Sequence, residues 1–60
     1  MIRVTIHFIN RGRGREHEAI STNERDGVYF VYTSTATYKY PLVNVLEIIE
    51  ISQFGETVVS

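Results

Sequence analysis

The sequence predicts an all-β domain, a small antiparallel meander or barrel of five or six strands, of the size of SH3, Sm and OB barrels. Three observations support this prediction. Residues 1–9 alternate between apolar and polar side chains, which is the period of a half-buried strand. Segments rich in β-branched and aromatic residues then recur between short turn-forming segments. No segment has a helical period that outweighs its β-branched content.

The first hairpin is predicted over residues 1–22. Alternate residues from Ile2 to Phe8 are apolar and form the buried face of the opening strand. Residues 10–15 are rich in glycine and arginine, which favours an exposed loop. The returning strand, residues 16–22, has few apolar side chains and is expected at a sheet edge. If this hairpin paired Ile9 with Arg15, the imidazoles at positions 7 and 17 would face each other.

The second hairpin is predicted over residues 23–40. Residues 23–27 form a turn, for which the Asp-Gly pair is the strongest signal. Residues 28–33 are all β-branched or aromatic and predict a central strand or one covered on both sides. Ser34 and Thr35 then lead into a strand over residues 36–40, but they leave its register open. A two-residue turn places one set of side chains on a common face, namely Tyr29, Val31, Tyr38 and Tyr40. A three-residue turn instead gathers Phe30, Tyr32, Tyr38 and Tyr40.

The last third of the chain is predicted to end in another hairpin. Pro41 ends the preceding ladder because it has no N–H to donate. Residues 42–45 suggest a single helical turn or a kink, and residues 46–52 favour a strand over a helix because they are rich in isoleucine. Residues 53–56 turn the chain again. Residues 57–59 are expected either to add a short strand or to fray.

The length of 60 residues indicates one small domain, residues 1–60, with little stability to spare. Scaling estimates of its hydrophobic burial and of its ordering entropy come out about equal. The chain has no cysteine for a disulfide or a structural zinc site. Self-association is the remaining way to complete the core, so we expect a homo-oligomer.

The location of the protein is predicted from what the sequence lacks. Absence of cysteine fits a reducing compartment. The chain has neither a signal-peptide pattern nor an apolar run long enough to span a membrane. We therefore expect a cytoplasmic protein without a membrane partner.

Four tyrosines within a short stretch are the candidate protein-interaction residues, since tyrosine suits a surface that is dry on one side and wet on the other. They are Tyr29, Tyr32, Tyr38 and Tyr40. Phe30 lies among them. We expect at least one of the tyrosines to belong to the core.

Basic residues provide an alternative site. Residues 1–15 contain four arginines and no acidic residue, whereas the rest of the chain contains two basic and seven acidic side chains. The four candidates for phosphate contacts are Arg3, Arg11, Arg13 and Arg15. In a nucleic-acid-binding β-barrel, the tyrosines would stack on unpaired bases beside them. The net charge of −1 argues against a general attraction to DNA.

Other chemistry has little support in the sequence. His7 and His17, with Glu16 and Glu18 nearby, provide too few ligands for a convincing metal site. No cysteine nucleophile and no persuasive Ser-His-acid set is present. We therefore expect no metal, no cofactor and no catalytic residue.

The sequence thus predicts a non-enzymatic protein-interaction module that associates with itself and binds another protein through the tyrosine hairpin. Small domains of this kind are frequent among accessory and inhibitor-type proteins of phages, plasmids and bacteria. The nucleic-acid-binding barrel is the alternative. The two hypotheses differ in whether the arginine loop shares a face with an exposed tyrosine.

Overall fold

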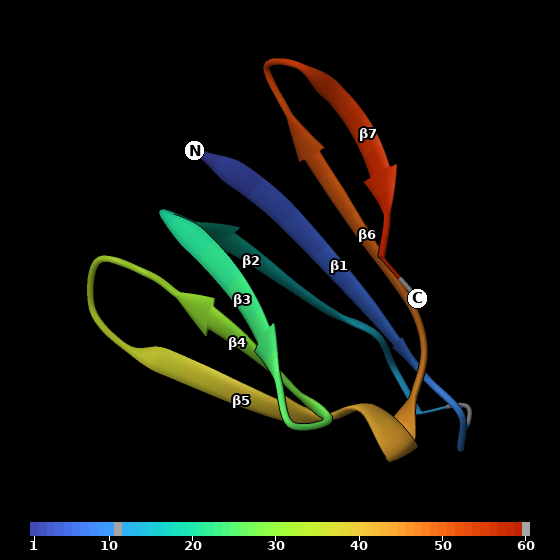
Figure 1. Cartoon of the computed structure of the whole chain (residues 1–60). Coiled ribbons are helices and arrows are strands. Elements are labelled where there is room, and N and C mark those ends of the chain that lie inside the picture. Colours follow the sequence, from blue (N-terminus) through green and yellow to red (C-terminus); the bar gives the residue numbers. More distant parts are fainter. Residues whose placement is uncertain (11, 60) are drawn as a thin grey trace.

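The computed structural model describes residues 1–10 and 12–59, which form two antiparallel sheets (Figure 1). The elements are β1 (Ile2–Phe8), β2 (Arg15–Ala19), β3 (Ser21–Arg25), β4 (Val28–Tyr32), β5 (Thr37–Pro41), the 3-10 helix η1 (Leu42–Asn44), β6 (Val45–Ser52) and β7 (Gly55–Val58). Sheet A has the order β2-β1-β6-β7 and sheet B the order β3-β4-β5. The predicted all-β, antiparallel class is confirmed.

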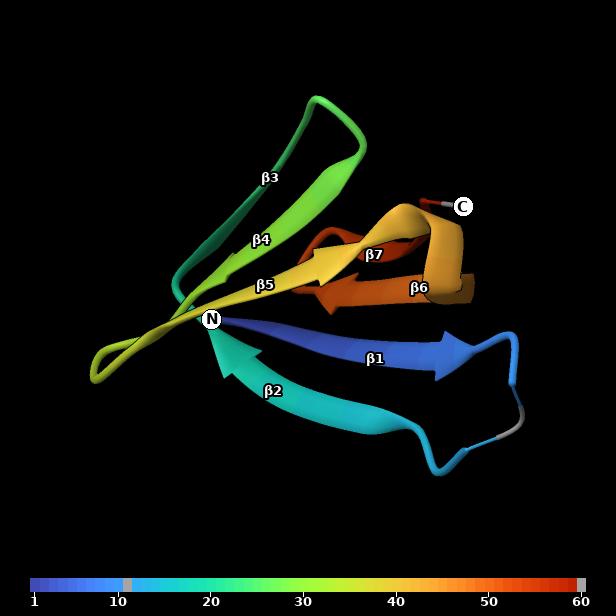
Figure 2. The same cartoon turned by 90° about the horizontal axis from the view of Figure 1, so that it is seen from below.

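The number of strands and the barrel closure differ from the prediction. The predicted strand over residues 16–22 is divided at Ile20, so the structure has seven strands rather than five or six. The backbone N–H of Ile20 donates to the carbonyl of Tyr32 (2.7 Å), and the chain thereby passes from sheet A to sheet B. Within the described residues no ladder joins the two sheets, which therefore form an open sandwich instead of a barrel. The sheets cross at an angle (Figure 2).

The first hairpin does not have the register under which the two histidines would face each other. Val4, rather than His7, lies opposite His17, and Ile2 lies opposite Ala19. This register turns Ala19 inward, where it is fully buried. Pairing the two histidines would have moved Ala19 to the outer face, because a shift by an odd number of residues exchanges the two faces of a strand.

The second hairpin has the register predicted for a two-residue turn. Tyr29 lies opposite Tyr40 and Val31 opposite Tyr38. The N–H of Thr33 donates to the carbonyl of Ala36 (2.9 Å) and closes the turn.

The turn before β4 is tighter than the predicted residues 23–27. Only Asp26 and Gly27 lie outside the strands, with φ values of 55° and 75°. Two successive positive φ values are typical of a type I′ turn, for which Asp-Gly is well suited.

The elements predicted for the last third of the chain are present with shifted bounds, because the helical turn ends at Asn44 and the predicted turn over residues 53–56 is shortened to Gln53 and Phe54. Helix η1 follows Pro41, residues 45–52 form a strand, and β7 adds a fourth strand to sheet A. Leu46 is the extra residue of a β-bulge, because Phe8 pairs with Val45 and His7 with Glu47. No helix in the described part of the chain has the length and apolarity to cross a membrane.

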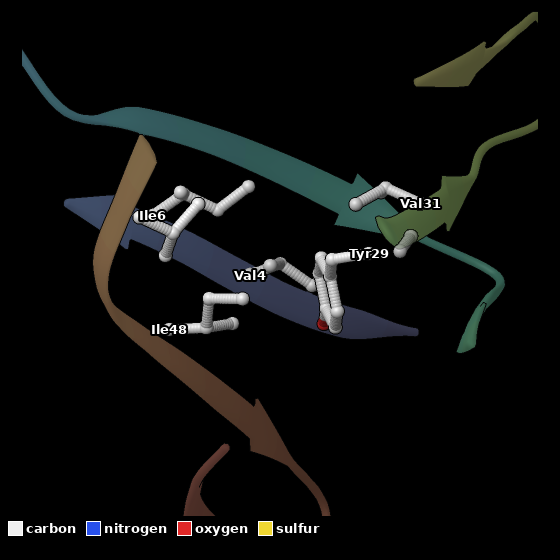
Figure 3. Packing of buried hydrophobic residues seen from close by; sticks show 7 residues of the cluster. Val4, Ile6, Tyr29, Val31 and Ile48 are labelled. Atoms are coloured by element: carbon white, nitrogen blue, oxygen red, sulfur yellow. The ribbon is translucent and has the colours of Figure 1, made fainter. Parts of the chain in front are cut away.

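The core lies between the two sheets and consists of seven buried side chains (Figure 3). They are Val4, Ile6, Ala19, Tyr29, Val31, Val45 and Ile48. The buried side chains of β1, β2 and β6 in sheet A pack against the inward side chains of β4 in sheet B. Side chains at alternate positions of these strands therefore point away from the core and form the two outer faces.

Candidate binding surfaces

Tyr29 belongs to the core and is not a surface residue. Its side chain is 1% exposed, and its hydroxyl donates a hydrogen bond to Glu50 Oε2 on β6. Burial, followed by the hydrogen bond to Glu50, raises the pKa of the Tyr29 hydroxyl. Tyr29 therefore cannot act as the interface residue that the sequence suggested. The expectation that one tyrosine belongs to the core is confirmed.

The outer face of sheet B, which we call face B, combines apolar and basic side chains. Alternation along its three strands places nine residues there, namely Ser21, Asn23, Arg25, Val28, Phe30, Tyr32, Thr37, Lys39 and Pro41. The rings of Phe30 and Tyr32 are half-buried and nearly parallel, with centroids 6.2 Å apart. The Arg25 guanidinium lies 5.7 Å from the Phe30 ring centroid. Face B thus has an apolar centre, two cations and no carboxylate.

The outer face of sheet A, which we call face A, is bordered by acidic side chains. It comprises Arg3, Thr5, His7, Glu16, Glu18, Glu47, Ile49, Ile51, Glu56 and Val58. Ile51 and Val58 are 46% and 57% exposed and form its apolar part with Ile49. Arg3 lies 3.4 Å from Glu18 and 3.9 Å from Glu16, and His7 Nδ1 lies 3.3 Å from Glu47. Four carboxylates against one arginine leave face A acidic.

A third surface lies where β2 and β5, one edge strand from each sheet, come together. We call it the β2–β5 seam, formed by Phe8, Arg15, His17, Tyr38 and Tyr40. His17 Nε2 is 2.5 Å from the Tyr40 hydroxyl, and the His17 ring stacks on Tyr38 with centroids 4.4 Å apart. The Phe8 and Tyr40 ring centroids are 5.9 Å apart.

The electrostatics of the seam depend on burial and on Arg15. Burial, and then the nearby positive charge of Arg15, lower the pKa of His17. Burial raises the pKa of the Tyr40 hydroxyl, and the charge of Arg15 opposes this shift. Both effects favour the neutral form of His17.

The structure separates the predicted site residues. Tyr32 lies on face B, whereas Tyr38 and Tyr40 line the seam. Arg3 lies on face A in its ion pairs, Arg13 is exposed in the loop, and Arg11 lies outside the described residues. Of the predicted arginines, Arg15 lies on the inner face of β2, two residues before His17, and its charge acts on the hydroxyl of Tyr40.

Sequence reasoning missed several residues of these surfaces. Arg25 and Lys39 carry no local signal beyond their charge. Phe8 lies on the inward face of its strand, as predicted, and packs against the core, but its contact with Tyr40 has no local signal. The two-residue turn register, once chosen, would have placed Phe30 and Tyr32 on the face opposite Tyr29. For His17 the sequence indicates only a surface histidine near acidic residues or a weak metal-ligand candidate. Its stacking on Tyr38 depends on the contact between sheets, which has no local sequence signal.

The described part of the chain contains neither a pocket nor a group of three metal-capable side chains. Comparisons of the chain with protein-family models, with curated proteins and with solved structures found no match. The three surfaces are therefore the features from which a function must be argued.

Proposed function

We propose that the protein is a non-enzymatic protein-interaction module of the cytoplasm that associates with copies of itself in a head-to-tail manner. In this assembly, face A of one copy packs on face B of the next. Two sheets that stack face to face bury the side chains between them and lie about 10 Å apart.

The observation that carries the proposal is the complementarity of the two faces. Face B presents Phe30 and Tyr32 between the cations Arg25 and Lys39, without an acidic side chain. Face A presents three aliphatic side chains bordered by four carboxylates. Stacking A on B brings apolar groups together and pairs opposite charges, whereas A on A or B on B would bring like charges together.

The head-to-tail arrangement has a structural consequence. Because the two contacting faces are different, each copy retains one free face A and one free face B until the assembly closes into a ring. The end of an open assembly can therefore bind another protein that carries a matching face. This is how a module of this kind would act as an adaptor or an inhibitor.

Two single-face variants test the proposal. Phe30→Asp places a negative charge in the centre of face B, and Ile51→Asp does the same on face A. We expect the wild-type mass in light scattering to exceed 6.9 kDa at micromolar concentration and each variant alone to be monomeric. An equimolar mixture of the two variants should form a one-to-one heterodimer, because each retains the face that the other lacks.

Control variants separate assembly from folding. Val43→Asp makes the same kind of change at an 81% exposed position outside both faces, and it should keep the wild-type mass. Lys39→Glu reverses a charge on face B without removing apolar contacts, and it should weaken assembly. Circular dichroism checks that each variant is folded. A folded wild type that stays at 6.9 kDa at every concentration, or a mixture that stays monomeric, contradicts the proposal.

A further inference from the structure

From the β2–β5 seam we infer a second binding site, in which an unpaired nucleotide of a single-stranded nucleic acid stacks on Tyr38 while Arg15 contacts its phosphate. The site is separate from faces A and B and does not depend on self-association.

Tyr38 provides the stacking surface. One face of its ring already packs on His17 at a centroid distance of 4.4 Å, and the side chain remains 38% exposed. His17 is itself held by its hydrogen bond to the Tyr40 hydroxyl. A base that stacks on the exposed part of Tyr38 therefore meets a ring that is already packed on His17. Stacking of this kind tolerates any base, because every base has a π-face.

Arg15 provides a positive charge beside His17, the residue on which the Tyr38 ring stacks. Along β2 the side chains alternate, so Arg15 and His17 point inward while Glu16 and Glu18 point to face A. Both carboxylates lie within 4 Å of Arg3. In the described part of the chain, Arg15 forms no ion pair. Its guanidinium is thus available to a phosphate and is not neutralised by the acids next to it in sequence.

The loop before Arg15 contains a second arginine, Arg13, two residues before the seam residue Arg15. A Cβ atom on Gly14 would lie 2.9 Å from the Ile6 carbonyl oxygen and 3.0 Å from His7 Cδ2, so glycine is needed where the loop returns onto β1. Arg13 directly precedes this glycine and is exposed. Arg13 provides a further contact for the phosphate backbone of a single-stranded nucleic acid that runs past Tyr38.

The site favours a single strand over a duplex or a free anion. Stacking on Tyr38 requires a base whose face is accessible, which a paired and stacked base does not offer. Arg15 and Arg13 are the two arginines of the site in the described part of the loop. Two positive charges are too few to bind inorganic phosphate tightly without the contribution of a stacked base. Thymidine monophosphate, with one base and one phosphate, should therefore bind more weakly than an oligonucleotide.

Titration of a fluorescently labelled ten-residue oligothymidine into the wild-type protein tests the site by anisotropy. Tyr38→Ala should weaken binding about tenfold, because it removes the stacking ring, whereas Tyr38→Phe should bind within about twofold of wild type. Arg15→Ser should weaken binding and reduce the slope of log affinity against log salt by about 0.7, the value for one lost contact to a single strand.

Arg25→Ser is the matched control, because it removes an equal charge from face B and should leave binding unchanged. Unlabelled duplex DNA, thymidine monophosphate and inorganic phosphate should compete poorly. The inference is overturned by a wild type that does not bind the oligonucleotide, by equal losses from Arg15→Ser and Arg25→Ser, or by a duplex that competes as well as the single strand. None of these results bears on the head-to-tail assembly, which is measured by mass without nucleic acid.

Discussion

The hydroxyl of Tyr29, on the inner face of β4, donates a hydrogen bond to the Glu50 carboxylate on β6 and thereby joins the two sheets. The same carboxylate oxygen accepts a hydrogen bond from Thr22 Oγ1 at 2.9 Å. Glu50 lies opposite Val4 in the ladder of β1 and β6, so it belongs to the inner face of sheet A. This polar contact lies at the border of the apolar core and joins β3, β4 and β6, whereas the seam lies on β2 and β5.

Removing the Glu50 carboxylate should therefore destabilise the protein. Glu50→Ala leaves the hydroxyls of Tyr29 and Thr22 without their acceptor, and we expect a loss of about 2 kcal/mol in the free energy of unfolding. Urea denaturation measures this loss. In a Tyr29→Phe background the loss should be smaller, since one donor is already absent. Equal losses in both backgrounds would show that the two side chains are not coupled.

The two faces of β1 should respond differently to a charge. Ile6 is fully buried, so Ile6→Asp places an unpaired carboxylate in the core and should unfold the domain. Thr5→Lys should change the free energy of unfolding by less than about 1 kcal/mol, because Thr5 lies on face A opposite Glu16. Thermal melts followed by circular dichroism compare the variants. Unfolding by both substitutions would contradict the assignment of Thr5 to an outer face.

The turn between β3 and β4 should depend on its glycine. Gly27 has a φ of 75°, where a Cβ atom strains the backbone, so Gly27→Ala should cost about 1 kcal/mol. Gly12 lies in the first loop, where a Cβ atom would lie 3.4 Å from Asn10 Oδ1, an ordinary van der Waals distance. Gly12→Ala is therefore the control and should change the stability measured in urea by less than about 0.5 kcal/mol. A larger effect at Gly12 than at Gly27 would contradict the predicted role of the turn.

The stability of the protein should fall between neutral and mildly acidic pH because of His17. Burial and Arg15 lower the pKa of His17 in the folded state below its unfolded value of 6.5. The unfolded chain therefore binds a proton first, and stability that is present above pH 6.5 is lost as the pH falls toward the folded-state pKa.

The His17→Gln variant tests this pH dependence. It cannot titrate in this range, so its melting temperature should change less between pH 7.5 and pH 5.5, a window set by the ordinary pKa of about 6.5. The charged and titratable groups beside His17 are Arg15, Tyr38 and Tyr40. An unchanged pH profile in the variant would assign the effect to another group.

The sequence alone determined the local structure of this protein. Alternation in residues 1–9 identified β1, the Asp-Gly pair identified a turn, and the isoleucines of residues 46–52 identified a strand. These features depend on steric preferences within a few residues and on a two-residue period, both of which the sequence shows directly.

The tertiary structure decided how the strands divide between sheets and which side chains meet. Ile20 has no turn signal, yet its hydrogen bond to Tyr32 moves the chain from sheet A to sheet B and produces a seventh strand. The register that buries Ala19 turns His17 inward, where it meets Tyr38 and Tyr40 from a different sheet. The segregation of acidic face A from basic face B arises in the same way. Such contacts join residues that are distant in sequence, and they are selected by burial of the whole core, so no local pattern predicts them.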